Sequence, residues 1–247
     1  MLKGLYTSAL GLAAVNKQQE VSANNLSNVN TVGYKKEAVM LRSFPSMLIK
    51  RLHDPAVRGD KPPVVGTLSM GVQLSDIVTD YGKGNVRDTG NPSHLALLGE
   101  GYFTVNTPRG ERYTRNGDFK LSPDGILVTA DGYPVLGMNG EIAVKNGDFT
   151  VDQWGGIFSG GREIDRLRIV VFDRPIIKEG SSLFSGEEPR ETATPQVAQG
   201  FLEDSNADAI SEMVNMINIM RAYEANQKVI QTQDATLDKT VNEIGRL

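Results

Sequence analysis

The feature that most constrains this chain is its C-terminal segment, in which neither proline nor glycine occurs from position 201 to 244. Side chains along it fit a stripe with alternating steps of three and four residues, the spacing of a heptad helix. The stripe comprises Met213, Met216, Met220, Tyr223, Gln227, Ile230, Asp234, Leu237, Val241 and Ile244, and it is widened at its beginning by Ile210, Val214 and Ile217. A helix over 203–244 would run to roughly 60 Å.

A second stripe of the same spacing opens the chain and predicts another helix. It comprises Leu2, Leu5, Ala9, Leu12, Asn16, Gln19, Ala23 and Leu26, so Asn16 and Gln19 are polar positions in its middle. The stripe ends in a stretch rich in asparagine that contains Asn24, Asn25, Asn28, Gly33 and Tyr34. Asparagine and glycine both accept a left-handed backbone, so we expect the helix to stop there and the chain to turn.

The middle of the chain differs in kind, because turn dipeptides recur in it at short intervals. Their glycines are seven or eight residues apart, at positions 110, 117, 125, 132, 140 and 147, and each follows Asn, Asp or Arg. Such pairs favour tight turns between short antiparallel strands. The sequence therefore predicts an α+β protein. We expect a terminal helical assembly domain (1–34 and 203–247), a connecting stem (35–70 and 187–202) and a central all-β domain (71–186).

Two segments beside the helices carry opposite charge. Residues 35–61 have a formal charge of +4 and residues 187–212 one of −6. We expect them to meet, within one subunit or between neighbours. Exposed ion pairs contribute only ~0.2–1 kcal/mol each, so we expect these pairs to steer assembly more than to hold it.

Composition excludes several classes of function. The chain has no cysteine, which excludes disulfides, thiolate metal sites and cysteine nucleophiles. A net charge of −4 argues against attraction to nucleic acid or an anionic membrane. No apolar run approaches the ~20 residues of a membrane span. Thr7 and Ser8 interrupt the apolar start of the chain, so we expect no cleaved signal peptide there.

No motif in the chain points to catalysis or to a bound ligand. Ser93, His94 and Asp88 contain the residue types of a catalytic triad, but no G-x-S-x-G elbow accompanies them. The aspartates of the middle region lack the spacing of a calcium loop. We expect no catalytic residue, no cofactor, no metal and no small-molecule substrate.

The two helical stripes favour assembly with other chains. Two paired helices bury one seam, and this leaves the widening at Ile210, Val214 and Ile217 uncovered; exposed apolar surface of this kind marks an interaction site. An intramolecular helical hairpin packed on the β domain is the alternative. We expect removal of 1–30 and 205–247 to leave a folded, monomeric β domain.

The stripes also predict a register if the helices run antiparallel with their chain ends together. Leu2 would then lie near Ile244, and Gln227 opposite Asn16 and Gln19, within about one turn. The alternative is that these polar residues face a wet channel and do not meet.

Four stretches of the chain resemble the family of flagellar basal-body rod and hook proteins. They are Ala23–Lys35 (ANNLSNVNTVGYK), Gly101–Val105 (GYFTV), Tyr113–Gly117 (YTRNG) and Glu212–Asn226, with EMVNMI at its start and RAYEAN at its end. The opening MLKGLY and the segment FPSML look most like rod proteins of Gram-positive bacteria, proximal or distal.

The resemblance implies a structural subunit of a self-assembling tube. Its terminal helices would line an export channel, with the β domain outside, and its partners would be other copies and neighbouring rod and hook proteins. It also implies export by the flagellar type III apparatus without cleavage, and a place in the basal body within the periplasm or cell-wall space. A secreted β-rich binding module or adhesin, and a type III translocator or tip protein, are the alternatives.

Overall fold

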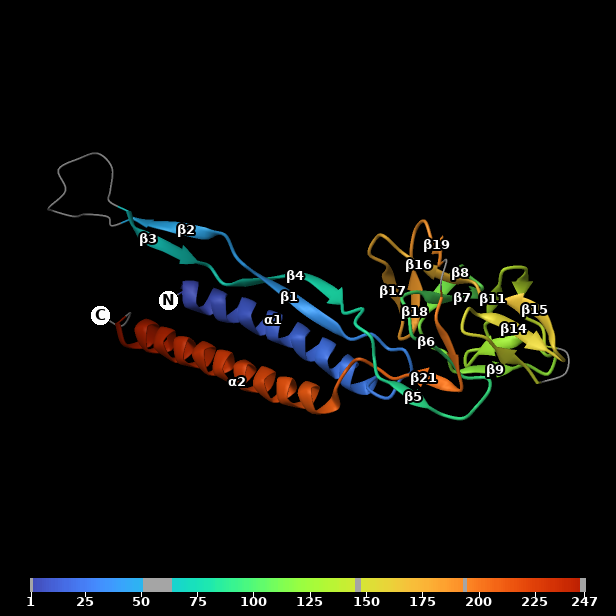
Figure 1. Ribbon diagram of the computed structural model, residues 1–247. Coiled ribbons are helices and arrows are strands. Elements are labelled where there is room, and N and C mark those ends of the chain that lie inside the picture. The colour runs from blue at the N-terminus through green and yellow to red at the C-terminus, as the bar shows by residue number, and fades with distance from the viewer. Residues whose placement is uncertain (1, 51–63, 145–147, 193–194, 245–247) are drawn as a thin grey trace. The chain divides into compact units, whose positions relative to one another are not determined.

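The computed structural model describes residues 2–50, 64–144, 148–192 and 195–244 (Figure 1). A helix at each end of the chain and a strand-rich middle confirm the predicted α+β class. The chain forms two compact units, each built from segments far apart in the sequence. We call residues 1–24, 37–78 and 210–247 the helical unit, and residues 25–36 and 79–209 the β unit. The predicted three-part division stays a prediction, and these units divide the chain at other positions.

The helical unit contains two long antiparallel helices that lie side by side, α1 (Leu2–Ser27) and α2 (Ala209–Lys239) (Figure 1). A π-helical turn, Thr240–Ile244, follows α2. The last residues of α1 belong to the β unit. Both predicted helices are present, because good helix formers dominate these segments and neither proline nor a run of glycines interrupts them. The C-terminal helix begins at Ala209 and not at 203 as predicted, since Phe201–Glu203 form a strand.

The described residues between 37 and 79 form strands, where the sequence predicted only a connecting stem over 35–70. Strand β1 (Glu37–Ser43) pairs with β4 (Val72–Thr79), and β2 (Ser46–Lys50) pairs antiparallel with β3 (Val64–Ser69). Apolar side chains on β2 and β3 are exposed, among them Met47, Leu48, Val64 and Val65. An exposed ribbon lacks the inside–outside alternation that identifies a half-buried strand. The part of the predicted stem between β2 and β3 lies outside the described residues.

The β unit contains a six-stranded sheet in the order β17-β18-β8-β7-β16-β19 and smaller sheets around it. The strands are β5 (Val86–Asp88), β6 (Leu95–Leu97), β7 (Tyr102–Thr107), β8 (Gly110–Thr114), β9 (Phe119–Leu121), β10 (Leu127–Thr129), β11 (Leu136–Gly137), β12 (Gly140–Glu141), β13 (Thr150–Val151), β14 (Gly156–Ser159), β15 (Arg162–Arg166), β16 (Ile169–Val171), β17 (Ile177–Glu179), β18 (Leu183–Ser185), β19 (Arg190–Glu191), β20 (Val197–Gln199) and β21 (Phe201–Glu203).

The predicted turn dipeptides join several of these strands. Gly110 lies at the turn between β7 and β8, Gly125 between β9 and β10, and Gly140 between β11 and β12. All three have positive φ, at 98°, 78° and 126°, which glycine adopts without a steric penalty. The dipeptide Asn146-Gly147 includes positions outside the described residues.

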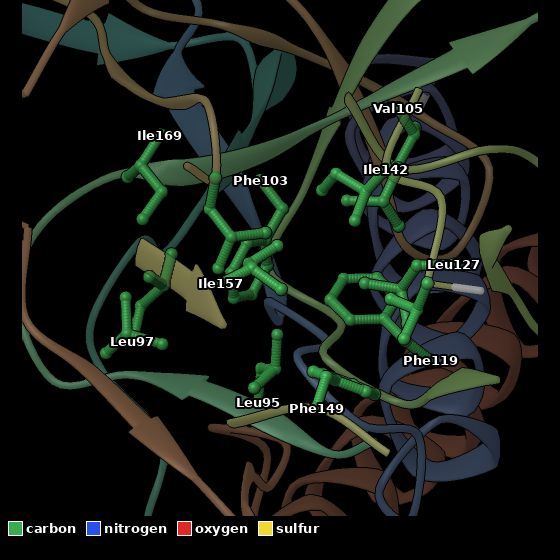
Figure 2. Close-up of a cluster of buried hydrophobic side chains, with 14 residues drawn as sticks. Leu95, Leu97, Phe103, Val105, Phe119, Leu127, Ile142, Phe149, Ile157 and Ile169 are labelled. Carbon is green, nitrogen blue, oxygen red and sulfur yellow. The ribbon is translucent and has the colours of Figure 1, made fainter. Parts of the chain in front are cut away.

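One large apolar cluster forms the core of the β unit (Figure 2). The rings of Phe103 and Phe119 meet edge to face, with centroids 5.1 Å apart. The cluster comprises Leu95, Leu97, Phe103, Val105, Phe119, Leu127, Val135, Ile142, Val144, Phe149, Ile157, Leu167, Ile169 and Val197. It therefore includes Leu95 and Leu97 from β6 and Val197 from β20, a hundred positions further along the chain. Among the helices that the structure describes, none is long and apolar enough to cross a membrane.

Candidate assembly surfaces and the terminal junction

Three charged side chains meet inside the β unit. Nζ of Lys35 lies 2.6 Å from Oε1 of Glu203, and Nε of Arg115 lies 2.5 Å from Oε2 of the same carboxylate. Their side chains are 2%, 5% and 1% exposed for Lys35, Arg115 and Glu203. Lys35 follows the N-terminal helix, Arg115 follows β8, and Glu203 ends β21, so this cluster joins three segments of the β unit that lie far apart in the sequence. We call these three residues the terminal junction.

The cations of the terminal junction also have backbone acceptors. Arg115 donates hydrogen bonds to the carbonyls of Gly101, Leu97 and Gly99, at 2.5 to 2.8 Å. Lys35 donates to the carbonyl of Gly82 at 2.8 Å, and Oε1 of Glu203 accepts from the backbone N–H of Gly84 at 3.0 Å. Because these polar groups are hydrogen-bonded to one another and to the backbone, the terminal junction has the character of a structural cluster that holds segments of the β unit together.

The protonation states follow from this environment. Burial alone would raise the pKa of Glu203, but the charge of Arg115 and the hydrogen bonds from Lys35 and Gly84 outweigh it and lower the pKa. Burial lowers the pKa of Lys35, and the pairing with Glu203 opposes that effect.

The backbone at Gly33 and Tyr34, beside the terminal junction, packs tightly against neighbouring segments of the β unit. The N–H of Gly33 donates to the carbonyl of Glu203 at 2.7 Å. Gly33 has φ of 66°, and a Cβ there would lie 2.5 Å from the carbonyl carbon of Arg115. Tyr34 is fully buried and donates its hydroxyl to Oδ1 of Asn25 at 3.1 Å. Nζ of Lys178 lies 3.9 Å from the Tyr34 ring centroid, a cation–π contact.

The structure therefore brings together part of the predicted N-terminal motif. Asn25, Gly33 and Tyr34 meet beside the terminal junction, Leu26 is half-buried, and Asn24 is exposed. Oδ1 of Asn28 accepts a hydrogen bond from the Thr31 hydroxyl at 3.2 Å.

Sequence reasoning missed the terminal junction as a site, although one signal pointed toward it. The approach expected between residues 35–61 and 187–212 is confirmed at one pair, Lys35 and Glu203. That pair is buried, whereas the prediction assumed exposed pairs. Lys36, the next basic residue, lies 3.7 Å from Asp80, which is outside the acidic segment.

The predicted assembly residues of α2 lie on two sides of the helix. Met216, Tyr223, Ile230 and Leu237 are half-buried. A separate group is exposed, from Ile210 at 70% to Met213 at 47%, and we call it the apolar face of α2: Ile210, Met213, Val214, Ile217 and Met220. Val241 is also exposed. On α1, Leu5, Leu12 and Leu26 are half-buried, and the side chains of Leu2 and Ile244 lie outside the described residues.

Three small residues of α1 lie against α2. A Cβ on Gly4 would lie 3.3 Å from Gln233, and one on Gly11 would lie 3.1 Å from Asn226. Near the other end, the Ser22 hydroxyl donates to Oε2 of Glu212 at 2.7 Å, and both residues are buried.

These contacts give a register different from the one expected. Since Gly11 faces Asn226, Asn16 lies about level with position 221, and Gln227 lies about level with position 10. Gln227 is thus offset from Asn16 by about 1.7 helical turns and from Gln19 by about 2.5, at about 3.6 residues per turn. Asn16, Gln19, Gln227 and Asp234 are all exposed. The prediction failed because it placed the two chain ends level, whereas Gly4 lies against Gln233 and Gly11 against Asn226.

Among the described residues, no group of three or more His, Asp or Glu side chains is arranged to hold a metal ion. His94 follows a turn and forms an isolated β-bridge with Asp118, and its ring contacts Thr89, Asn91 and Asp118.

Comparison with known proteins matches both ends and the middle of the chain. Residues 5–35 match the family described as "Flagella basal body rod protein", residues 96–159 match "Flagellar hook protein FlgE/F/G D1 domain", and residues 198–243 match "Flagellar basal body rod FlgEFG protein C-terminal". The chain is 31% identical to the flagellar hook-basal body complex protein FlhO of Bacillus subtilis, over 100% of both chains. It is 32% identical to the flagellar basal-body rod protein FlgG of the same organism, over 98% of this chain and 99% of that one. It is 31% identical to the flagellar basal-body rod protein FlgF of Caulobacter vibrioides, over 100% of both.

Proposed function

Since this chain belongs to the family of flagellar basal-body rod proteins, we propose that it is a structural subunit of the flagellar rod that assembles through its terminal helices. Its role is mechanical and not catalytic. Its partners are other copies of itself and neighbouring rod and hook proteins, and the assembled helices form a tube around an export channel. The chain reaches the basal body, in the periplasm or cell-wall space, through the flagellar type III apparatus without cleavage of a signal peptide.

The apolar face of α2 is the observation that supports assembly. Its five side chains, Ile210, Met213, Val214, Ile217 and Met220, are each 47% to 70% exposed. They recur at helical spacing on a helix of 31 residues, about 46 Å long. A contiguous apolar face of this kind marks a protein interaction site. We assign it to contact with a neighbouring subunit.

A heptad pairing of α1 and α2 is the finer part of this proposal. The protected positions of α2 recur in steps of three and four, namely Glu212, Met216, Ile219, Tyr223, Asn226, Ile230, Gln233 and Leu237. This is the spacing of a seam between two helices. Gly4, Gly11 and Ser22 lie against it from α1. One side of α2 thus contacts α1 of the same chain, and the apolar face contacts a neighbouring subunit.

A pair of matched double variants tests the role of the apolar face. Val214→Lys/Ile217→Lys places two charges on this face, and Asn215→Lys/Asn218→Lys places the same charges on exposed neighbouring positions of the same turns. Each variant is expressed in a strain from which the chromosomal gene for this protein is deleted. We expect the first variant to be produced but to give no swimming and no complete rods by electron microscopy of basal bodies. We expect the control to restore both.

The same strains separate the proposal from its alternatives. A deletion strain that swims normally would point to a secreted binding module or a translocator and would refute the rod function. A deletion strain that fails to swim, but is rescued by both double variants, would retain the rod function and reject the apolar face as its interface.

A further inference from the structure

The β unit cannot be completed without residues near the end of the chain. Strand β20 pairs antiparallel with β6, with Val197 opposite Leu97, and both residues belong to the core cluster. Strand β21 pairs with β5, with Glu203 opposite Val86. A chain that stops short of β20 lacks the partner strands of β5 and β6 and leaves part of the core exposed.

The terminal junction adds an electrostatic requirement. Lys35 and Arg115 are buried, and both contact the same carboxylate, that of Glu203. Removing one partner of a buried ion pair leaves a desolvated charge that the fold does not tolerate well. Without Glu203 in place, Lys35 and Arg115 are therefore more stable exposed to water than buried side by side.

The segment 25–36 also depends on residues 203–206, which supply its hydrogen-bond acceptors. Its Gly33 N–H needs the carbonyl of Glu203 as acceptor, and the N–H of Lys36 donates to Oδ1 of Asn206 at 2.7 Å. Nδ2 of Asn206 in turn donates to the carbonyl of Asp80 at 2.8 Å. Residues 203–206 thus connect the first segment of the β unit to the second.

We propose that Glu203 is a late-closing lock, so that the β unit stays open until residues 197–209 have joined the segment 25–36. A chain that emerges from any channel with its N-terminus first then completes this unit only after about four-fifths of its length has emerged. This inference goes beyond the rod function, because it concerns the order of folding and holds for any exit route.

Folding kinetics of the full-length protein test the proposal. Trp154 is the only tryptophan in the chain and belongs to the β unit, so its fluorescence reports on that unit. We compare Glu203→Gln with the wild-type protein in urea-jump unfolding and refolding. Asp204→Asn is the matched control, since it changes the next carboxylate, which is 40% exposed and lies 3.4 Å from Arg87.

We expect Glu203→Gln to unfold at least about 30-fold faster and to refold within about twofold of the wild-type rate, since interactions formed after the transition state change mainly the unfolding rate. Asp204→Asn should stay within about twofold of wild type in both rates. If Glu203→Gln does not fold, Lys35→Met replaces it, because the pair of Arg115 and Glu203 remains. The same pattern with a smaller change is then expected.

Three results would overturn the proposal. Refolding that slows by the full factor of the lost stability would place the terminal junction in the folding nucleus. An unfolding rate of Glu203→Gln equal to that of the wild-type protein would show that Glu203 does not keep the β unit closed. Equal effects of Glu203→Gln and Asp204→Asn would trace the change to net charge and not to the lock.

Discussion

Gly33→Ala tests how closely the N-terminal turn approaches the strands of the β unit. Gly33 has φ of 66°, a region that an L-residue adopts at a cost of roughly 1–2 kcal/mol. The added Cβ would lie 2.5 Å from the carbonyl carbon of Arg115 and 2.6 Å from the nitrogen of Asn116. Both are backbone atoms, so a side-chain rotation cannot relieve the overlap.

The magnitude follows from adding these two effects. Overpacking of this kind costs about 1–3 kcal/mol, so the total loss for Gly33→Ala is about 2–5 kcal/mol. Gly132→Ala is the matched control, because Gly132 has φ of 85° but no atom within 4 Å of an added Cβ. Its loss should be the conformational cost alone, about 1–2 kcal/mol.

Urea unfolding of the full-length variants, followed by Trp154 fluorescence, measures both losses. At an m-value of about 2 kcal/mol/M, the midpoint should fall by about 1–2.5 M for Gly33→Ala and by about 0.5–1 M for Gly132→Ala. Equal midpoints for the two variants would refute the close approach of Gly33 to Arg115. In that case the hydrogen bond from Gly33 to Glu203 would also lose its structural basis.

Two further predictions concern the β unit. First, the folded-state pKa of Glu203 lies below its ordinary value of 4.5, so its stabilising contribution is present at neutral pH and is lost as the pH falls from about 4.5 through the folded-state pKa. Urea midpoints between pH 7 and pH 3 should drop more for wild type than for Glu203→Gln, and parallel pH profiles would contradict this. Second, a fragment of residues 25–209 should melt at a higher temperature than one of residues 31–204. The shorter fragment lacks Asn25 and Asn206, which hydrogen-bond Tyr34 and Lys36, and equal melting temperatures by circular dichroism would count against these bonds.

Local chemistry made a large part of the fold predictable. The helices follow from residue spacing and from the absence of helix breakers. The hairpins follow from glycine at positions 110, 125 and 140, where the turn itself requires positive φ. In each case the evidence lies within a few residues of the feature.

The terminal junction could not be predicted in the same way, because its evidence is spread over the chain. Lys35, Arg115 and Glu203 each look like an ordinary surface charge when read with their neighbours. The pairing of β21 with β5, the turn at Gly33 and the hydrogen bonds of Arg115 to backbone carbonyls bring them together. The opposite charges of the two segments indicated that they meet, but not that one pair is buried, since burial depends on tertiary packing.

For the helices the prediction was incomplete in another way. The pattern of apolar residues was recognised, but it was assigned to one face of α2, whereas the residues lie on two. The predicted α2 stripe mixed half-buried positions, such as Met216 and Tyr223, with exposed ones, such as Met213 and Met220. On α1, glycine and serine occupy the positions that contact α2, and a search for apolar residues passes over them.

This division of faces follows from what each contact requires. Gly4 and Gly11 carry no side chain to hold α2 away, so polar side chains such as Asn226 and Gln233 can lie directly against the backbone of α1. The contact with α1 protects the apolar side chains of α2 that face it, whereas the large side chains of Ile210, Val214 and Ile217 stay exposed. Burial of apolar area contributes about 25 cal/mol per Å², so the largest unused gain of α2 lies on its apolar face. A second chain is the partner that can supply this gain. We therefore infer that α2 serves assembly through its apolar face, while its opposite side contacts α1.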